Sequence, residues 1–462
     1  MAIKKKGPPR ERIGRVSLYD HHGQPWLYYT EGGQSVRRPA GVSGPAAQAI
    51  ASLINARLAA AAAQVDVFKL IGDWLPRAAP AERSGARLSS LRAGFLDHHE
   101  NVLASARGTV ARYGTATAHV VDHAGADADP LDIDVAAFVT YLRRLEVSPN
   151  GHANTAKRKL RDKGLQYILQ TCRSMVRFGQ QHGLLDKSAV NPFSVYPIGR
   201  IVVRDRKPVF VFTAAQEEAF FCNIAGHAFA IQMVLAKTAM RPAELTHSLI
   251  EDVDLDGGWW HVRSKPELGW TTKTNRERAI PLVDEVAGLV RAVIGARKAG
   301  LVFLRQQECD LNGRDRAALG DVGGKRLSEL STDERAHRSR VEAVYHGVWQ
   351  EAGIVNTDKI RLSFIKTAKA AGLPAHATCP KSWRHTFATV LQQANVDLLI
   401  RQETLGHKPS DPSAGALGMT GVYTHTDPQT QYGQVTAAMR LRPATLALGK
   451  SHFLTSIEKV PS

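Results

Sequence analysis

The sequence predicts a multidomain, mainly α-helical protein with small antiparallel sheets, and three observations lead to this fold class. The chain has 462 residues, which is enough for roughly three domains of about 150 residues each. Apolar residues recur three and four positions apart over long stretches, as amphipathic helices require. Two regions instead carry short strand-like segments bounded by turn residues. We therefore expect a small β-plus-helix module, a helical domain and a mixed α+β domain.

The composition favours a polyanionic partner. Lys and Arg total 60 against 43 Asp and Glu, which gives a net charge of +17, and such an excess is typical of proteins that bind nucleic acid. A basic soluble protein without such a partner is the alternative. The four cysteines lie far apart and form no CxxC pair, so we expect neither a zinc site nor disulfides. No signal peptide or membrane span is indicated, and we expect a cytoplasmic protein.

Residues 1–65 predict a small basic module of strands and one helix. The segments RIGRVSLYD and PWLYYTE have the composition of short strands, and His22-Gly23 between them is a turn signal. The alanine-rich run of residues 46–63 is interrupted by Gln48, Asn55 and Arg57. This pattern predicts an amphipathic helix.

Residues 84–193 predict an all-helical domain. Its stretches ASARGTVARYGTATAHVVDHAG, DVAAFVTYLRRL and LQYILQTCRSMVRFGQQHGLL all have helical apolar spacing. The stretch of residues 197–208 has little apolar periodicity and carries four basic residues, Arg200, Arg204, Arg206 and Lys207. We interpret it as a basic linker that contacts DNA. A solvated connector that contacts nothing is the alternative.

From residue 212 onward, helices give way to a short sheet and then to further helices. The segments WWHVR, GWTTKT and RERAIPL predict its strands, with turns at Lys265-Pro266 and Asn275-Arg276. Residues 305–340 are rich in charge and glycine and have few large apolar side chains. We expect an inserted surface loop there.

In two segments of the mixed domain, a basic residue stands where a predicted helix or strand ends. Arg241 follows an apolar helix and precedes Pro242, and Glu244 can hold its guanidinium in one orientation. Lys273 lies near the end of a predicted strand, just before a turn. Taken alone, a surface Arg-Glu pair and an exposed hairpin lysine explain both segments more simply.

Three more segments follow in the C-terminal third. Lys381 and Arg384 lie three residues apart and share one face of a predicted helix. His407, in Leu405-Gly406-His407, ends the next helix, and Tyr423 stands sixteen residues later in GVYTHTD. A helix-end histidine and a half-buried tyrosine are the simpler explanations for each residue alone.

Taken in order, the segments T-x-x-R-x-x-E-L, K-T-x-x-x-R-x-I-P-L, K-x-x-R-H-T-F-A-T, L-G-H and Y-T-H resemble the tyrosine recombinase (phage integrase) family. Each motif is weak, but five in this order are specific. The resemblance implies a catalytic domain over residues 208–445 and a helical, SAM-like core-binding domain over residues 66–197. It further implies an arm-type DNA-binding extension over residues 1–65, with residues 446–462 as a C-terminal tail.

The resemblance implies a site-specific DNA recombinase that cleaves and rejoins DNA through a 3′-phosphotyrosine intermediate, as a mobile-element integrase does. Arg241 and Arg384 correspond to the phosphate clamp, Lys273 to the general acid and Tyr423 to the nucleophile. Lys381 occupies a position where histidine is usual, and His407 the second histidine position. No metal or other cofactor is implied. The implied partners are double-stranded DNA, further copies of the chain in a homotetramer on DNA, and accessory DNA-bending proteins. The implied location is the cytoplasm, in association with the nucleoid.

Three features depart from the family pattern. Ala239 stands where glycine is usual, Lys381 replaces histidine, and Gly418 lies in a long connection between His407 and Tyr423. Tyr432 is an alternative nucleophile. Two alternative functions remain, a type IB topoisomerase and a catalytically silent DNA-binding accessory protein. The separate helical domain and the N-terminal extension favour recombination over strand relaxation.

Overall fold

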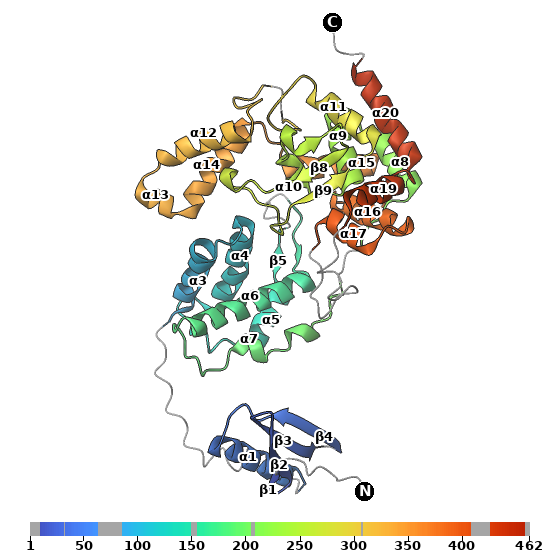
Figure 1. The fold of residues 1–462 in the computed structure, drawn as a ribbon. Coiled ribbons are helices and arrows are strands. Elements are labelled where there is room, and N and C mark those ends of the chain that lie inside the picture. The colour runs from blue at the N-terminus through green and yellow to red at the C-terminus, as the bar shows by residue number, and fades with distance from the viewer. Residues whose placement is uncertain are drawn as a thin grey trace, which may run out of the picture. The chain divides into compact units, whose positions relative to one another are not determined.

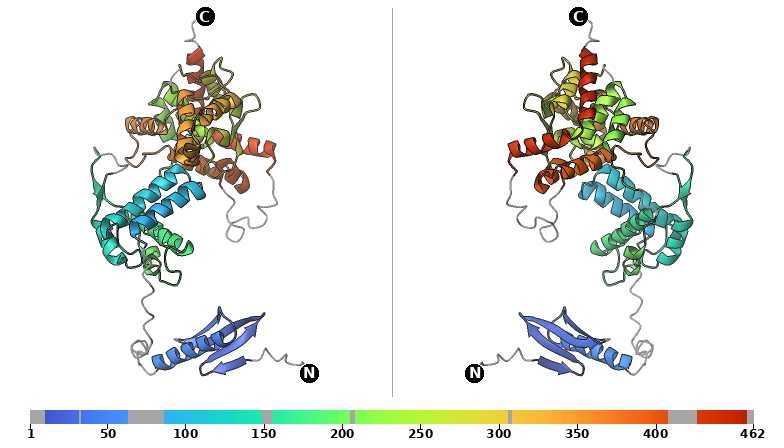
Figure 2. Two further views of the ribbon diagram at one scale, coloured as in Figure 1. Left: turned by 90° about the vertical axis from the view of Figure 1, so that its left-hand side faces the viewer. Right: turned by 90° about the vertical axis from the view of Figure 1, so that its right-hand side faces the viewer.

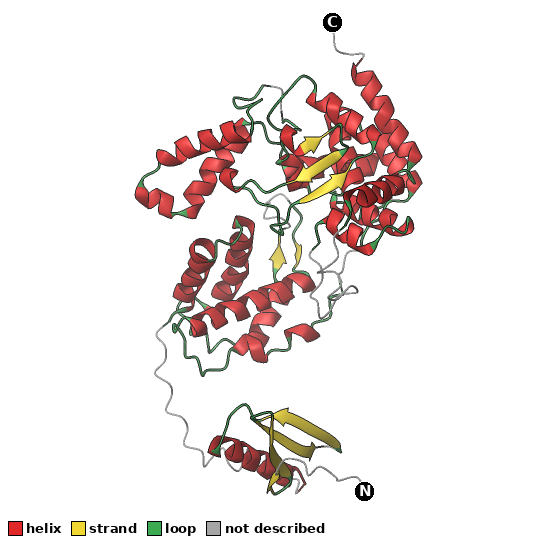
Figure 3. Cartoon of the chain, in the orientation of Figure 1, coloured by secondary structure: helices red, strands yellow, loops and turns green. Residues whose placement is uncertain are grey.

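The computed structural model describes residues 10–31, 33–62, 86–148, 155–204, 208–305, 308–407 and 426–457. The chain divides into two compact units, residues 1–86 with residues 180–189, and residues 87–179 with residues 190–462. Helices predominate, with small sheets beside them (Figure 3), and this confirms the predicted fold class. None of the helices in the described ranges is long and apolar enough to cross a membrane.

The N-terminal module is a four-stranded antiparallel sheet with one helix against it. The strands β1 (Arg10–Ile13), β2 (Val16–His21), β3 (Gln24–Glu31) and β4 (Gln34–Pro39) pair in chain order. Helix α1 (Pro45–Ala62) lies along one face of the sheet (Figure 2). The alternation in β2 and β3 turns one set of side chains toward the helix, and these form a buried core of Val16, Leu18, Leu27 and Tyr29 with Ala47, Ala51, Ile54 and Leu58. The predicted helix and the strand at PWLYYTE are confirmed, whereas RIGRVSLYD forms parts of two strands, β1 and β2, with a turn at Gly14 and Arg15, and β4 is additional.

The next region is helical, as predicted, apart from one small strand pair. Its helices are α3 (Leu88–Asp97), the π-helix η1 (His98–Val102), α4 (Arg107–Ala124), α5 (Val135–Arg144), α6 (Asp162–Gln181) and α7 (Pro192–Val195). Between α5 and α6, β5 (Glu146–Val147) pairs with β6 (Arg158–Lys159). The buried side chains include Phe95, Val120, Phe138, Ile168 and Met175. The linker that follows contains one 3-10 turn, η3 (Ile198–Arg200).

The mixed region is built around a three-stranded antiparallel sheet in the order β7 (Val253–Asp254), β8 (Trp259–Val262) and β9 (Arg278–Pro281). Its helices before the sheet are α8 (Ala214–Cys222), α9 (Gly226–Thr238) and α10 (Pro242–Thr246), and α11 (Asp284–Ile294) follows it. The later helices are α15 (Thr357–Ala370), α16 (Lys381–Gln393), α17 (Leu398–Leu405), α19 (Pro428–Met439) and α20 (Pro443–Ile457). Figure 1 shows their arrangement around the sheet.

An aromatic cluster holds these helices together. Trp383 of α16 stacks on Phe212, with ring centroids 3.9 Å apart, and its edge meets Phe220 and Phe364. All four rings are buried. Large aromatic side chains contribute much of the apolar burial that stabilises a core, so this packing anchors α16 in the core.

The strand expected at GWTTKT, between WWHVR and RERAIPL, does not form. β8 pairs directly with β9, with Trp260 opposite Ile280. The connection of residues 263–277 forms local hydrogen bonds instead, because Lys265 and Trp270 exchange backbone bonds of 2.8 and 3.0 Å around the 3-10 turn η5 (Pro266–Leu268). Lys273 therefore lies in a turn and not near a strand end.

The expected surface loop at residues 305–340 is also wrong. The segment contains α12 (Arg316–Ser328) and α13 (Thr332–Ala336), and α14 (Arg338–Glu351) follows. Asp315 caps α12, and Ser331 and Glu334 form a capping box at α13. Gly323 faces Tyr345 of α14, where an added Cβ would lie 3.1 Å from the ring. Glycine here permits close packing of two helices, although in the sequence it resembles a loop signal.

The C-terminal stretch also differs from the expected tail of residues 446–462. Helix α20 begins at Pro443, and Leu446 is buried in the main core. The helix packs along α11 and α8. The expected boundary after residue 445 therefore falls inside a helix.

Candidate active site

Arg241 stands at the junction between α9 and α10. The ten residues from Phe229 to Thr238 of α9 are buried, and the helix ends at Ala239, whose backbone is left-handed with φ 51° and ψ 22°. Pro242 then starts α10, where its missing N–H is not needed. This reversal turns the Arg241 side chain toward Glu244, and its Nη1 lies 2.6 Å from Glu244 Oε1.

Glu244 is shared by a second arginine that the sequence analysis did not single out. The side chain of Arg278 is 5% exposed, and its Nη2 and Nη1 lie 2.6 and 3.3 Å from Oε2 and Oε1 of Glu244. Its Nε donates to the carbonyl of Thr404 at 3.0 Å. Strand alternation was the available signal, because Arg278 lies two residues before the buried Ile280 on β9.

The charge of Glu244 is maintained although its carboxylate is buried. Burial alone would raise its pKa, but hydrogen bonds and charges from Arg278 and Arg241 outweigh burial and hold the pKa below its usual range. Glu244 therefore stays ionised at neutral pH. It fixes both guanidiniums through charge-assisted hydrogen bonds.

Arg384 is held by backbone carbonyls at the ends of two other helices. Its Nη1 donates to the carbonyl of Ala239 at 2.8 Å, and its Nη2 donates to the carbonyl of Leu405. Carbonyls at helix C-termini lack intrahelical partners and carry partial negative charge, so they suit a cation. Burial, and then the charges of Arg241 and Arg278, lower the pKa of Arg384 to about 10. The guanidinium remains protonated at pH 7.

His407 follows directly on the end of α17. Gly406 ends the helix in a left-handed conformation with φ 61° and ψ 41°, and an added Cβ there would lie 2.9 Å from the Arg278 guanidinium. The glycine is therefore required by its backbone and by Arg278. Burial lowers the pKa of His407, and the charges of Arg384, Arg241 and Arg278 lower it further. The imidazole is neutral at pH 7 in the absence of a bound anion.

The two lysines lie at the surface. Lys381 is the exposed first residue of α16, one turn before Arg384, while Phe387 and Leu391, one and two turns after Arg384, are buried. Lys273 is exposed in the connection between β8 and β9. Neither ammonium forms a hydrogen bond or ion pair with another residue in the described part of the chain.

The remaining candidates fall in three groups. Tyr423, Arg206 and Lys207, as well as Gly418, lie outside the described residues. Arg200 and Arg204 are exposed in the linker, where the backbone N–H of Arg204 donates to Asp162 at 3.0 Å. The alternative nucleophile Tyr432 is occupied elsewhere, because its hydroxyl donates to the carbonyl of Leu282 at 3.3 Å and its ring packs against Trp259.

The structure thus gathers three guanidiniums, one carboxylate and one neutral imidazole from four separate places in the chain: α10 with its N-cap, β9, α16 and the end of α17. The guanidiniums outnumber the carboxylate, so the cluster carries excess positive charge. Fixed guanidiniums in a partly buried site favour binding of a tetrahedral oxyanion over a neutral ligand. Charge development on such an anion is what this arrangement can stabilise.

Comparison with known proteins gives a family match over the residues that carry this site. Residues 214–430 match the phage integrase family. An integrase/recombinase of Escherichia coli is 27% identical over 243 residues, which are 49% of this chain and 63% of that protein. A tyrosine recombinase XerD of Bifidobacterium longum is 28% identical over 193 residues, 42% of this chain and 47% of that protein. The match thus spans less than two thirds of these relatives. A Tn1549 transposon integrase solved with circular intermediate DNA is 17% identical, with a TM-score of 0.49, covering 76% of this chain and 99% of that chain.

Proposed function

We propose that this chain, which matches the phage integrase family over residues 214–430, is a site-specific DNA recombinase that forms a 3′-phosphotyrosine intermediate. The observation that carries the proposal is the fixed pair of guanidiniums, Arg241 tied to Glu244 and Arg384 tied to the carbonyls of Ala239 and Leu405. In the proposal these two arginines clamp the scissile phosphate. Arg278 is a positioning residue, because its ion pair with Glu244 fixes the carboxylate that orients Arg241.

The physical requirement is charge compensation. Attack on a phosphodiester builds negative charge on the non-bridging oxygens, and planar, permanently protonated guanidiniums bind such oxygens through paired hydrogen bonds. Their orientation is set before the DNA binds, because backbone and carboxylate partners already hold them. Preorganised charge of this kind needs little rearrangement as the transition state forms.

The proposed cleavage step forms one bond at the phosphorus and breaks another. The phenolic oxygen of Tyr423 attacks the phosphorus and forms a new P–O bond, and the bond from phosphorus to the 5′ oxygen breaks. Lys273 gives a proton to the departing 5′ oxygen. A phenol has a pKa near ~10 and needs a base or a cationic pocket to lose its proton at pH 7. His407 can accept that proton, since its lowered pKa leaves the imidazole neutral.

Rejoining is the same chemistry in reverse. A 5′ hydroxyl attacks the phosphotyrosine, the tyrosine leaves, and the proton returns to it. The energy of the broken phosphodiester is retained in the tyrosyl ester, so no nucleotide hydrolysis is needed. When the strands are exchanged between two duplexes before rejoining, cleavage and rejoining together recombine the DNA. We infer that the reaction integrates or excises a mobile element.

The test is covalent capture on a nicked DNA substrate that releases a short strand after cleavage and so cannot rejoin. We expect wild-type protein and the control Tyr432→Phe to form an adduct that survives denaturing electrophoresis, and Tyr423→Phe to form none. Adduct formation by Tyr423→Phe together with its loss in Tyr432→Phe would reverse the assignment. Absence of any adduct with specific DNA binding intact would favour the silent accessory protein.

A second measurement separates recombination from strand relaxation. We expect the protein to bind one DNA sequence selectively and to exchange strands between two copies of it. Relaxation of supercoiled plasmid with equal efficiency on any sequence would favour the type IB topoisomerase alternative. The net charge of +17 supports DNA as the substrate in either case.

The N-terminal module is proposed to bind an arm-type site apart from the crossover. In its sheet, Arg12, Trp26, Tyr28 and Arg37 alternate with the residues that face α1 and so lie on the opposite face. The Arg37 guanidinium lies 5.3 Å from the Tyr28 ring centroid. Arginine and aromatic side chains on one sheet face suit a phosphate backbone and base edges. We also propose two kinds of protein partner: further copies of the chain, which form a tetramer on DNA, and accessory DNA-bending proteins.

A further inference from the structure

The segment just before Lys273 is buried against the helices α12 and α14. Leu268 is 1% exposed and belongs to a second core, separate from the main one, with Leu319 of α12 and Val348 and Trp349 of α14. The indole N–H of Trp349 donates to the carbonyl of Leu268 at 2.9 Å. The connection between β8 and β9 is thus packed against a helical insertion, α12 to α14, through its residue Leu268. Figure 1 shows this insertion as a helical hairpin beside the sheet.

Gly269 makes this contact close. Its backbone is left-handed with φ 65°, and an added Cβ would lie 2.5 Å from a ring carbon of Tyr345 on α14. Backbone and ring therefore touch directly. The next residue, Trp270, stacks on His247 with ring centroids 4.8 Å apart, and the edge of Trp349 meets the same imidazole at 4.8 Å.

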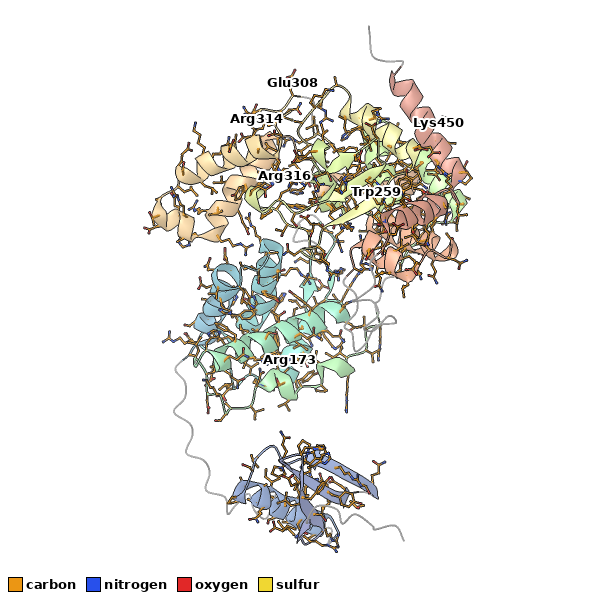
Figure 4. The ribbon with its side chains drawn as sticks, viewed as in Figure 1. Arg173, Trp259, Glu308, Arg314, Arg316 and Lys450 are labelled. Carbon is orange, nitrogen blue, oxygen red and sulfur yellow. The ribbon has the colours of Figure 1, made fainter. Side chains whose placement is uncertain are left out.

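An ion cluster fixes the other side of the same segment. The ammonium of Lys265 lies 2.7 Å from Asp252 Oδ2, and both side chains are fully buried. Arg316, labelled in Figure 4 at the start of α12, lies 3.4 Å from Asp252 Oδ1 and 3.5 Å from Glu267. The insertion therefore holds the connection by packing and by charge. Removing one partner from such a buried set leaves an uncompensated charge, so the set resists local opening.

The order extends to the turn that carries Lys273. Thr272 is 3% exposed and its hydroxyl donates to the carbonyl of Arg276 at 3.0 Å. The N–H of Asn275 donates to the carbonyl of Thr272 at 2.9 Å, which closes a turn over Lys273 and Thr274. Lys273 is exposed at the tip of this turn, three residues after the stacked Trp270.

We propose that the α12–α14 insertion is a brace that positions Lys273 for proton transfer, with Tyr345 and Trp349 as positioning residues. This inference rests on the proposed function, in which Lys273 is the general acid. A connection of fifteen residues, 263–277, has many alternative conformations when unsupported. A general acid must lie within hydrogen-bond reach of the leaving oxygen, and a displacement of about 1 Å can cost roughly a hundredfold in rate.

The chemical test uses a DNA strand with sulfur in place of the 5′ bridging oxygen at the cleavage site. Sulfur leaves as a stable thiolate and needs no proton, so the substrate bypasses the acid. We expect Lys273→Ala, Tyr345→Ala and Trp349→Phe to slow cleavage of ordinary DNA, the last two by about tenfold or more, and to approach wild-type rates on the sulfur strand. The matched control is Arg335→Ala on α13, whose hydrogen bonds go to Leu330 and Ser328 within the insertion. It should leave both rates unchanged.

Equal slowing of Tyr345→Ala and Trp349→Phe on both substrates, or no slowing on either, would overturn the brace. If the sulfur strand instead rescues Lys381→Ala and leaves Lys273→Ala slow, then the assignment of Lys273 as the general acid is wrong. Limited proteolysis tests the brace independently of that assignment. Trypsin can cleave the connection after Lys273 and Arg276. The rate of this cleavage in the folded protein, followed by mass spectrometry, reports how often the connection opens. We expect faster cutting in Tyr345→Ala than in wild type and in Arg335→Ala. An unchanged rate would refute the brace.

Discussion

The carbonyl oxygen of Ala239 accepts a hydrogen bond of 2.8 Å from Arg384, while Ala239 itself has a left-handed backbone. One residue thus ends α9, turns the chain toward Arg241 and holds the second guanidinium. The sequence shows alanine at a position where glycine is usual in the resembled family, and the positive φ explains the usual preference, because glycine adopts it without steric cost.

Ala239→Gly should be nearly neutral, and Ala239→Val should not. Glycine relieves roughly 1–2 kcal/mol of backbone strain but loses about 0.8 kcal/mol of methyl burial and gains unfolded-state entropy worth about 0.4–1 kcal/mol. These effects nearly cancel. A β-branched residue at positive φ is a severe outlier, so Ala239→Val should lower the free energy of unfolding measured in urea and slow cleavage. A stable, fully active valine variant would contradict the strain.

Arg241→Ala and Arg384→Ala should each slow cleavage by roughly a hundredfold or more, about 3 kcal/mol, because developing charge on the phosphate is left uncompensated. The measurement is single-turnover adduct formation on the nicked substrate. Binding to uncleaved DNA should change far less. Retention of more than half the wild-type rate in either variant would refute the clamp.

Arg278→Ala should destabilise the fold by about 3 kcal/mol or more, because it leaves the buried Glu244 with one partner. The double variant Arg278→Ala with Glu244→Gln removes both charges and should recover part of that loss. A double-mutant cycle by urea unfolding at pH 7 measures the coupling. The coupling should shrink below about pH 4.5, because the unfolded carboxylate is protonated there. Additive single effects would show that the pair is not coupled.

His247 should make stability fall in mild acid. Burial lowers its pKa to about 4, the charges of Lys265 and His346 act in the same direction, and a hydrogen bond to the Ala243 carbonyl opposes them. Between pH 6.5 and about 4 the unfolded chain binds a proton that the folded protein rejects, so stability is lost as the pH falls. The loss amounts to about 3 kcal/mol once the pH is below about 4. Urea unfolding at several pH values should show a shallower pH dependence in His247→Gln than in wild type.

Deletion of residues 1–65 should spare cleavage of a short core site and weaken binding to a full attachment site. The sheet-face variant Arg12→Ala with Arg37→Ala should weaken the same binding and reduce its salt dependence, because phosphate contacts release counterions. The matched control is Arg57→Ala on α1, whose side chain pairs with Glu31 at 2.7 Å. Equal affinity of full-length and truncated protein for the full site would exclude an arm-binding role.

Local patterns in the sequence were sufficient to predict several elements. The alternation of β2 and β3, the apolar spacing in α4 to α6, and the face of α16 that carries Lys381 and Arg384 all follow from periodicity within one segment. The end of α17 at Gly406 was also predictable, because glycine terminates helices through its left-handed backbone. The contact between Arg241 and Glu244 spans only three residues, and it too was visible in the sequence.

The tertiary structure decided what depends on partners distant in the chain. Arg278 resembles an ordinary hairpin arginine until β9 carries it to Glu244, 34 residues earlier in the sequence, and to the Thr404 carbonyl. The insertion resembles a polar loop because α12 buries little beyond Leu319 and Gly323, and its apolar neighbours come from residues 249–311 and from α14. Periodicity records which face of a segment is apolar, whereas burial of a charge or a glycine depends on what packs against it. Those packing partners are brought together only when distant segments meet in the folded chain.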